Sequence, residues 1–315
     1  EAAFVSLSIP TLACLRTGGG GVVVVVVEEV MRRAAALSCL LTSRPSLITF
    51  DCTGTLFQPS APVGALYKRA VVAEGWKVGL AAAAIAEALD EEMLCNAFAS
   101  AYAAADAARP CFGAGMCTSE EWWRPVVHST IINAAHGSAS EVQPLIAGAF
   151  DTLFRETFVS QSGWALCPHA REALEAITEW RRQDSEPDVM LGVISNWDDR
   201  LPLLLRRLGI AHHFDMIVTS HELGIEKPSA GIFDRARALA GVATGARCVH
   251  VGDSFKRDVV GAATAGKGWE AVHVCSEEER ARVSPELLMT AEHLHFESLA
   301  TLPEWLGASA GAGRN

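Results

Sequence analysis

The sequence is short of positive charge: its 26 lysines and arginines face 37 acidic residues, and its formal net charge is −11. Its basic doublets, such as Arg181-Arg182 and Arg206-Arg207, are scattered along the chain and do not form a stripe. A surface that binds nucleic acid has its basic residues gathered on one face. We therefore expect no nucleic acid partner.

Paired cysteines and long apolar runs are also missing. The nine cysteines include no C-x-x-C pair, which argues against a zinc site, and an odd number cannot complete a disulfide framework. Reduced thiols fit a reducing compartment, so we expect the cytoplasm. The valine run within residues 17–30 is too short to cross a bilayer, and we expect no membrane partner.

Acidic residues are absent from residues 31–45, which read MRRAAALSCLLTSRP and follow a glycine and valine run of low complexity. Arginine, serine and leucine without acid are typical of a mitochondrial or plastid presequence. A short N-terminal helix is the alternative. We expect residues 1–45 to be an extension of low-complexity or targeting type, with import into a mitochondrion or plastid as the alternative location, and residues 307–315 to be a flexible tail.

The rest of the chain alternates short apolar runs with helical patterns. The predicted strands are residues 46–50, 189–195, 214–220, 247–252 and 269–274. The helices predicted between the last four strands are residues 199–208, 229–240 and 256–265. Strands that alternate with helices form a parallel sheet covered on both faces. We therefore predict an α/β fold with a Rossmann-like parallel sheet.

No convincing strand lies between the first and second predicted strands, a gap of well over a hundred residues that is rich in alanine. A segment of that length is an inserted domain, because structureless loops of this size are rare in compact proteins. We predict a core domain over residues 46–57 and 160–306 and an all-helical cap domain over residues 58–159.

Polar side chains lie where the predicted strands end. Asp51 follows the first strand, Gly54 allows a sharp bend after it, and Ser195-Asn196 ends the second strand. The carboxyl ends of parallel strands meet at one edge of the sheet, where ligands bind in open α/β folds. The sequence therefore predicts a ligand site at this edge.

Two further carboxylates and a lysine would join Asp51 there. Asp253 follows the strand at 247–252, Asp258 comes five residues later, and Lys227 precedes a predicted helix. Hard oxygen ligands of this kind suit Mg²⁺, and a lysine beside them would neutralise an anionic substrate.

These residues, in this order, resemble the four motifs of the haloacid dehalogenase (HAD) superfamily. The matching segments are DCTGT at 51–55, SN at 195–196, KP at 227–228, and GD at 252–253 with Asp258. The longer segments GIEKPSAGIF and GDSFKRDVVGAATAG strengthen the resemblance. The helical insert is similar to a C1-type cap, and TSEEWWRPVV within it resembles the hydrolase domain-containing protein 3 branch.

The resemblance implies a hydrolase that works through an aspartyl-phosphate on Asp51, with Ser195 and Lys227 as its catalytic partners. It implies that Mg²⁺ is held by Asp51, the Thr53 carbonyl and Asp253, with Asp258 at the metal's waters. The residues that it places around the substrate are Thr53, Gly54, Ser195, Asn196 and Lys227. The implied substrate is a small phosphorylated metabolite.

The chain lacks the second aspartate that most phosphatases of this family carry two positions after the nucleophile, where it has Thr53. Losing a general acid and base costs on the order of 10²–10⁴ in rate. We therefore predict slow turnover, fastest when the leaving group needs no proton. Cap residues that could replace the missing acid are His128, Glu120 and Glu121.

Two alternatives remain open at this stage. Haloacid dehalogenases also lack the second aspartate and use no metal, and their motifs resemble SNWD at 195–198, although Asp253 has no use in them. The other alternative is a pseudoenzyme, a binding module of this fold whose site decayed at Thr53.

Overall fold

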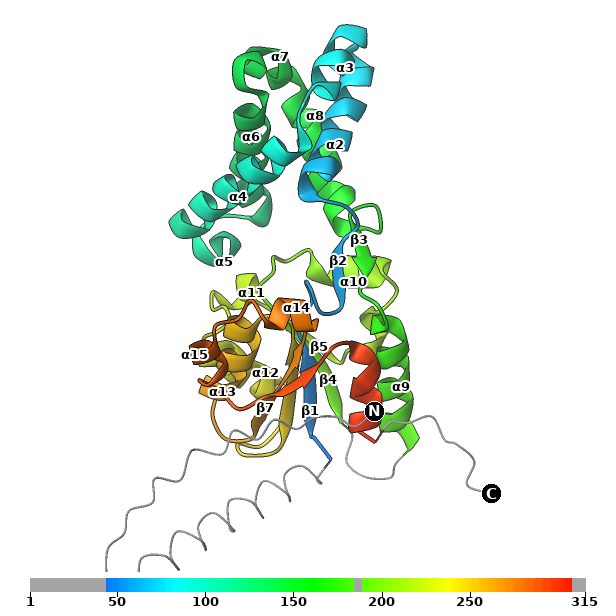
Figure 1. Cartoon of the computed structure of the whole chain (residues 1–315), viewed down its shortest axis with the longest axis vertical. Helices are drawn as coiled ribbons and strands as arrows, with labels where there is room; N and C mark the ends of the chain where they lie inside the picture. The colour runs from blue at the N-terminus through cyan, green and yellow to red at the C-terminus, as the bar shows by residue number, and fades with distance from the viewer. Residues whose placement is uncertain (1–43, 184–188, 308–315) are drawn as a thin grey trace, which may run out of the picture.

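The structure is a computed structural model that describes residues 44–183 and 189–307 (Figure 1). Its centre is a six-stranded sheet of order β5-β4-β1-β6-β7-β8 in which every neighbouring pair is parallel. The strands are β1 (Leu47–Phe50), β4 (Met190–Ser195), β5 (Met216–Thr219), β6 (Cys248–Gly252), β7 (Trp269–Val274) and β8 (Leu294–Phe296). The predicted Rossmann-like parallel sheet is confirmed.

The central strand β1 is buried along its whole length between β4 and β6. Successive side chains of a strand point to opposite faces, and both faces of a parallel sheet are covered by helices. Ile48 and Phe50 accordingly pack with one apolar cluster, and Leu47 packs with another. This explains why β1 is an almost unbroken apolar run that meets a carboxylate only at its end.

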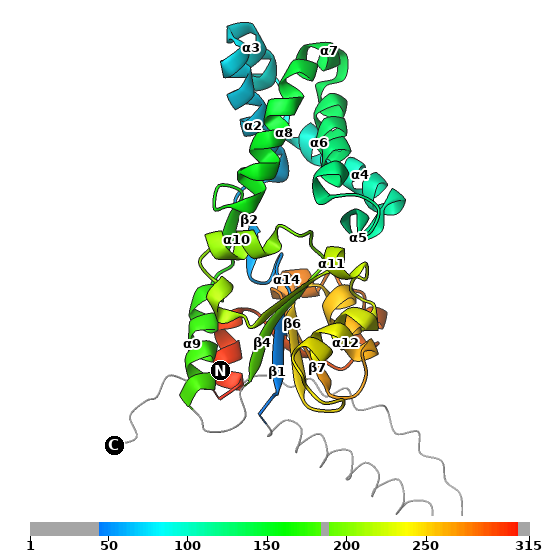
Figure 2. The same cartoon turned by 180° about the vertical axis from the view of Figure 1, so that it is seen from behind.

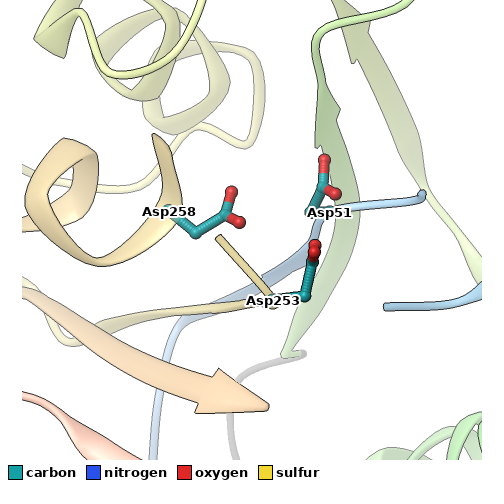
Figure 3. Close-up of side chains that lie close together, drawn as sticks. All are labelled: Asp51, Asp253 and Asp258. Carbon is teal, nitrogen blue, oxygen red and sulfur yellow. The ribbon is translucent and has the colours of Figure 1, made fainter. Parts of the chain in front are cut away.

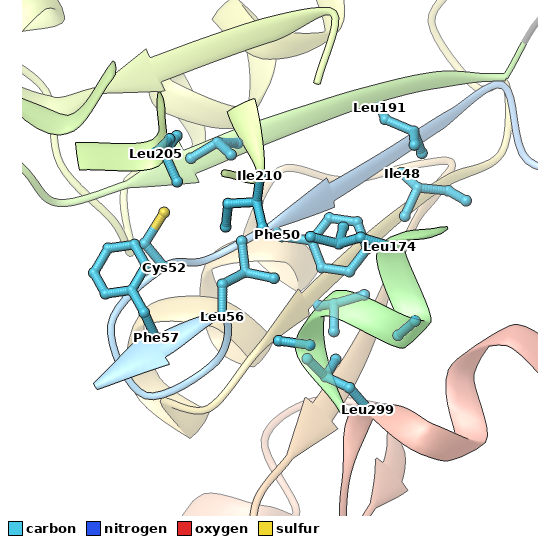
Figure 4. Packing of buried hydrophobic residues seen from close by; sticks show 14 of the residues in the cluster. Ile48, Phe50, Cys52, Leu56, Phe57, Leu174, Leu191, Leu205, Ile210 and Leu299 are labelled. Atoms are coloured by element: carbon cyan, nitrogen blue, oxygen red, sulfur yellow. The ribbon is translucent and has the colours of Figure 1, made fainter. Parts of the chain in front are cut away.

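Helices cover both faces of the sheet (Figures 1 and 2). Ile48 and Phe50 belong to the cluster in Figure 4, where they lie near Leu174 and Leu299. This face is covered by α9 (Ala170–Gln183), α10 (Leu201–Arg207), η6 (Leu299–Thr301) and α16 (Leu302–Trp305). The opposite face is covered by α12 (Ala230–Leu239), the π-helix η5 (Phe255–Val260) and α13 (Gly261–Thr264). Burial on both sides holds the strand ends in fixed positions.

The inserted segment is helical and lies beyond the carboxyl edge of the sheet (Figure 1). Its elements are α2 (Val63–Val78), α3 (Leu80–Glu87), α4 (Glu91–Ala108), α5 (Pro110–Gly113), α6 (Ser119–Ala135), η1 (His136–Ser138), α7 (Ala139–Val142), η2 (Gln143–Leu145), α8 (Ile146–Arg155) and η3 (Thr157–Val159). This arrangement is the helical cap that the resemblance implies.

Local signals in the sequence set the boundaries of the cap helices. The Asp90 side chain accepts a hydrogen bond from the Met93 backbone N–H at 2.8 Å and starts α4. Thr118 and Glu121 form a reciprocal capping box at the start of α6. Each such cap stabilises a helix by about 1 kcal/mol. The short α5 lies between these two helices.

Three short strands were not predicted. β2 (Phe57–Pro59) and β3 (Trp164–Leu166) form an antiparallel ribbon between the sheet and the cap, and β8 adds an edge to the sheet. Each has only three residues, too few for a periodic pattern. The predicted helix at 256–265 is instead the π-helix η5 followed by α13.

The remaining elements are peripheral: η4 (Ala211–His213), α11 (Ser220–Leu223), α14 (Glu277–Arg280) and α15 (Pro285–Leu288). None of the helices within 44–183 and 189–307 is long and apolar enough to cross a membrane. The predicted presequence lies outside the described residues, apart from Arg44 and Pro45, and so does nearly all of the predicted C-terminal tail.

Candidate active site

Asp51 lies at the end of β1, and its Oδ1 atom accepts from two donors, one at the end of β4 and one in the loop before α12. Ser195 Oγ donates to it at 2.9 Å and Lys227 Nζ donates at 2.6 Å. All three side chains are buried. Residues that are 144 and 176 positions apart from Asp51 therefore meet around one carboxylate.

Lys227 is a buried cation whose ammonium group has three acceptors. Besides Asp51, it donates to Asp258 Oδ1 at 2.6 Å and to the Ile194 carbonyl at 2.7 Å. Burial by itself would lower the pKa of Lys227, but Asp258 and Asp51 outweigh this effect and raise it. Lys227 is therefore held in its charged form.

Asp258 is orientated by donors at both of its oxygens. Its Oδ1 accepts from Lys227 and from His250 Nε2 at 3.1 Å, and its Oδ2 accepts from the Ser254 backbone N–H at 2.9 Å. Burial would raise the pKa of Asp258, but Lys227 and His250 reverse this effect and hold the pKa far below its ordinary range. Asp258 is thus a fixed anion.

His250 continues this network into the sheet. Since its Nε2 donates to Asp258, its Nδ1 accepts from Thr49 Oγ1 at 2.8 Å. Burial lowers the pKa of His250, which favours the neutral ring that this pattern requires. His250 is therefore a buried histidine with both ring nitrogens hydrogen-bonded, and it supports the site by orientating Asp258.

Asp253 follows β6 and approaches the turn after Asp51. Thr55 Oγ1 donates to its Oδ1 at 3.2 Å, and its backbone carbonyl accepts from His273 Nε2 at 2.9 Å. Gly54 has φ +89°, and a Cβ added there would lie 2.5 Å from Asp253 Oδ2. Only glycine therefore fits both the backbone angle and the space.

The three carboxylates lie close enough together to share one metal ion (Figure 3). One oxygen from each of Asp51, Asp253 and Asp258 lies within 4.8 Å of the others. Octahedral Mg²⁺, with ligands at about 2.1 Å, places neighbouring oxygens about 3.0 Å apart and opposite ones about 4.2 Å apart. Burial, Asp51 and Asp258 raise the pKa of Asp253 to about 7, a sign of crowded negative charge that a divalent cation would relieve.

The predicted substrate-binding residues lie beside this group. The Asn196 amide exchanges two hydrogen bonds with the Lys227 backbone, at 3.0 and 2.8 Å, and so fixes the lysine's position. Thr53 Oγ1 accepts from Trp197 Nε1 at 2.9 Å. A threonine thus occupies the position of the missing aspartate, and an indole holds its oxygen.

A cavity of about 600 Å³ lies over Asp51, between the core and the cap. Its lining includes Asp51, Thr53, Ser195, Asn196 and Lys227. This volume falls in the range of small-molecule sites, about 300–1,000 Å³. These five predicted residues therefore open onto a space of the size that holds a small substrate, whereas the predicted Gly54, Asp253 and Asp258 are not part of its lining.

The cap contacts the core through a buried ion pair beside the cavity. Arg200 binds Asp198 at 2.7 Å, and its Nη1 donates to the Phe154 carbonyl of the cap at 2.9 Å. Trp123 Nε1, also from the cap, donates to Asp198 Oδ2 at 2.7 Å. Burial would raise the pKa of Asp198, but Arg200 and Trp123 lower it below its ordinary value, so this carboxylate is unsuited to donate a proton.

The cap residues that we considered as replacement acids are engaged elsewhere. Glu120 pairs with Arg124 and Arg155, Glu121 closes the capping box, and His128 is exposed. None of the three belongs to the described lining of the cavity.

Trp197 and His250 were not predicted as parts of the site. Thr49 and His250 are register partners in two neighbouring buried strands. Two polar residues facing each other inside an apolar sheet are a signal that could have identified the network. No sequence signal places the Trp197 indole on Thr53.

The fold and this group of side chains define a capped α/β hydrolase, and sequence comparison agrees. The chain matches the haloacid dehalogenase-like hydrolase family over residues 45–266 and belongs to that family. It is 32% identical to haloacid dehalogenase-like hydrolase domain-containing protein 3 of Xenopus laevis, over 72% of this chain and 84% of that protein. The predicted resemblance to this branch is confirmed.

Two further relatives are informative. The chain is 45% identical to a glyceraldehyde 3-phosphate phosphatase of Methanothermobacter thermautotrophicus over 82 residues, 24% of this chain and 34% of that protein. The crystal structure of YfnB from Bacillus subtilis, bound to magnesium, has a TM-score of 0.54 at 15% identity and covers 84% of this chain and 100% of its own. The latter similarity establishes the fold.

Replacing Gly54 with alanine should weaken Mg²⁺ binding, because the new methyl group would displace Asp253. Gly245 is a matched control, since its φ is +88° against +89° at Gly54 and a Cβ there meets nothing within 4 Å. Both changes should cost about 1–2 kcal/mol of folding free energy through backbone strain. Only Gly54→Ala should reduce Mg²⁺ affinity in calorimetric titration; equal affinities in both variants would contradict this role of Gly54.

Proposed function

We propose that this HAD-family hydrolase is a Mg²⁺-dependent phosphatase of a small phosphate ester, with Asp51 as the nucleophile. The observation that carries the proposal is the meeting of Asp51, Asp253 and Asp258 beside a charged Lys227, where Asp51 and Lys227 line the cavity between the core and the cap. Phosphoryl transfer requires mainly positioning and neutralisation of charge, and this group can supply both.

In the proposed reaction an Asp51 carboxylate oxygen attacks phosphorus while the bond from phosphorus to the leaving oxygen breaks. Lys227 and Ser195 bind Asp51 Oδ1, so they fix the orientation of the carboxylate and leave its other oxygen to face the substrate. Water then attacks the aspartyl-phosphate, releases phosphate and restores Asp51. We assign the binding of the phosphoryl oxygens to Ser195 and the backbone at Asn196, as the family resemblance implies.

Mg²⁺ would be held by Asp51, Asp253 and the Thr53 carbonyl, and it would neutralise charge on the transferred phosphoryl group. Both oxygens of Asp258 are bound by donors of this chain. We therefore assign to Asp258 the role of orientating Lys227 and the metal's waters. The magnesium-bound YfnB structure and the archaeal phosphatase relative support this proposal as precedents within the same family.

Thr53 restricts which substrates turn over quickly. Its hydroxyl accepts from Trp197 and cannot act as a general acid near neutral pH. Asp198, the buried carboxylate nearest in the sequence to Trp197, is held ionised by Arg200. The leaving group must therefore depart as a stable anion or take its proton from water.

Removing Mg²⁺ should abolish activity. We expect the natural chain to release phosphate from 4-nitrophenyl phosphate with Mg²⁺ and to lose this activity with EDTA, with recovery when Mg²⁺ is added back. Chloride release from 2-chloropropionate, measured beside it, tests the dehalogenase alternative. Chloride release without metal and no phosphate release would overturn the proposal, and inactivity in both assays with no phosphoenzyme would favour a binding module.

A further inference from the structure

The cavity over Asp51 is walled by a series of aromatic rings. We call this series the aromatic belt; each ring in it lies beside the next, and all of them line the cavity. Its members, in order, are Trp123, Tyr102, Phe98, Tyr67, Phe158 and Trp164. Successive ring centroids are 5.7 to 6.1 Å apart.

The belt reaches the reaction centre through one more ring. Trp164 lies 5.3 Å from Trp197, whose Nε1 donates to Thr53 Oγ1. Thr53 stands two residues after the proposed nucleophile. An apolar wall therefore extends from the cap to the place where a leaving group would separate from phosphorus.

Charges along the cavity, apart from the Asp51–Lys227 pair, are balanced. The acidic members of the lining are Asp106, Asp198 and Glu226, and the basic members are Arg200, Lys256 and Arg257. Asp198 and Arg200 bind each other. Such a lining provides no excess of charge to attract a second phosphate or carboxylate on the substrate.

We propose that the substrate is the monophosphate ester of a flat, uncharged phenol, whose ring lies against the aromatic belt. This inference rests on the proposed function and specifies its substrate class. Stacking on the rings would bind the leaving group without hydrogen bonds, and a phenolic oxygen departs as a stabilised anion, which suits a site without a proton donor at Thr53.

Binding can be separated from leaving-group chemistry with phosphonates, which are not hydrolysed. We expect 2-naphthylmethylphosphonate to bind the natural chain with Mg²⁺ at least about 10-fold more tightly than methylphosphonate in calorimetric titration, since one aromatic contact is equivalent to about 2- to 12-fold. Equal affinities for the two phosphonates would overturn the inference.

Phe98 is the ring to change, because it lies in the middle of the belt and is only partly buried. Phe98→Leu keeps an apolar side chain of similar size and should lower the preference for the naphthyl compound by about 2- to 12-fold. Trp76→Ala is the matched control, since Trp76 belongs to the same cap but is 58% exposed and lies outside the lining. An unchanged preference in a folded Phe98→Leu protein would overturn the inference.

Hydrolysis of acetyl phosphate tests the phosphatase activity separately from the aromatic substrate class, because this small substrate needs neither the aromatic belt nor a proton donor. Mg²⁺-dependent hydrolysis of acetyl phosphate together with equal binding of both phosphonates would remove the aromatic substrate class and leave the phosphatase intact. No hydrolysis and no phosphoenzyme would overturn the proposed function, and this inference with it.

Discussion

Asp51→Asn should lower the rate of phosphate release by a factor on the order of 10⁴ or more, as is typical when a covalent nucleophile is removed. The amide retains an oxygen that can accept from Ser195 and Lys227, so the arrangement of the site should survive. What it loses is the negative charge that attacks phosphorus. Initial rates with 4-nitrophenyl phosphate and Mg²⁺ measure the effect.

Asp234→Asn is a suitable control, because Asp234 is an exposed carboxylate on α12 and lies outside the cavity lining. It should retain the rate of the natural chain. A rate within about 10-fold of the natural chain in Asp51→Asn would mean that another group attacks phosphorus, since such a change is only about 1.4 kcal/mol of barrier.

Thr53→Asp should increase the rate by up to about 10²–10⁴ for substrates with a poor leaving group, because it supplies the missing general acid and base. The Trp197 indole, which now donates to Thr53 Oγ1, could hold the new carboxylate in the same place. Benzyl phosphate, whose leaving oxygen requires a proton, should gain most. Acetyl phosphate should gain little, since its leaving group is already a stable anion.

Thr53→Asn separates proton transfer from shape, because asparagine resembles aspartate but does not exchange protons. It should stay at the slow rate of the natural chain. An equal rate for benzyl phosphate in Thr53→Asp and the natural chain would indicate that a residue other than Thr53 already performs this step.

The core fold was predictable because its strands are buried on both faces. Burial requires continuous apolar runs such as those of β4 and β6, and each run ends where a polar residue, Ser195 or Asp253, reaches the sheet edge. The three-residue strands β2, β3 and β8 were not predictable, since their pairing depends on tertiary context and not on a local pattern.

The candidate site also has a part that the sequence predicts and a part that it does not. Asp51, Lys227 and Asp253 were predicted from motifs at strand and loop ends, where spacing along the chain implies proximity. The aromatic belt could not be predicted, because Tyr67, Phe98 and the other rings come from several helices and from the strand β3, and the packing of these elements decides which faces line the cavity. The sequence shows that the cap contains aromatic residues, but it does not show which of their side chains point into the cavity.

The most direct test of the account is to trap the phosphoenzyme. The natural chain is mixed with acetyl phosphate and Mg²⁺, quenched in acid and digested, and the peptides are weighed by mass spectrometry. The account predicts one added phosphoryl group on the peptide that contains Asp51, absent when EDTA replaces Mg²⁺ and absent in Asp51→Asn. A phosphoryl group on another peptide, or the same label on Asp51→Asn, would contradict it.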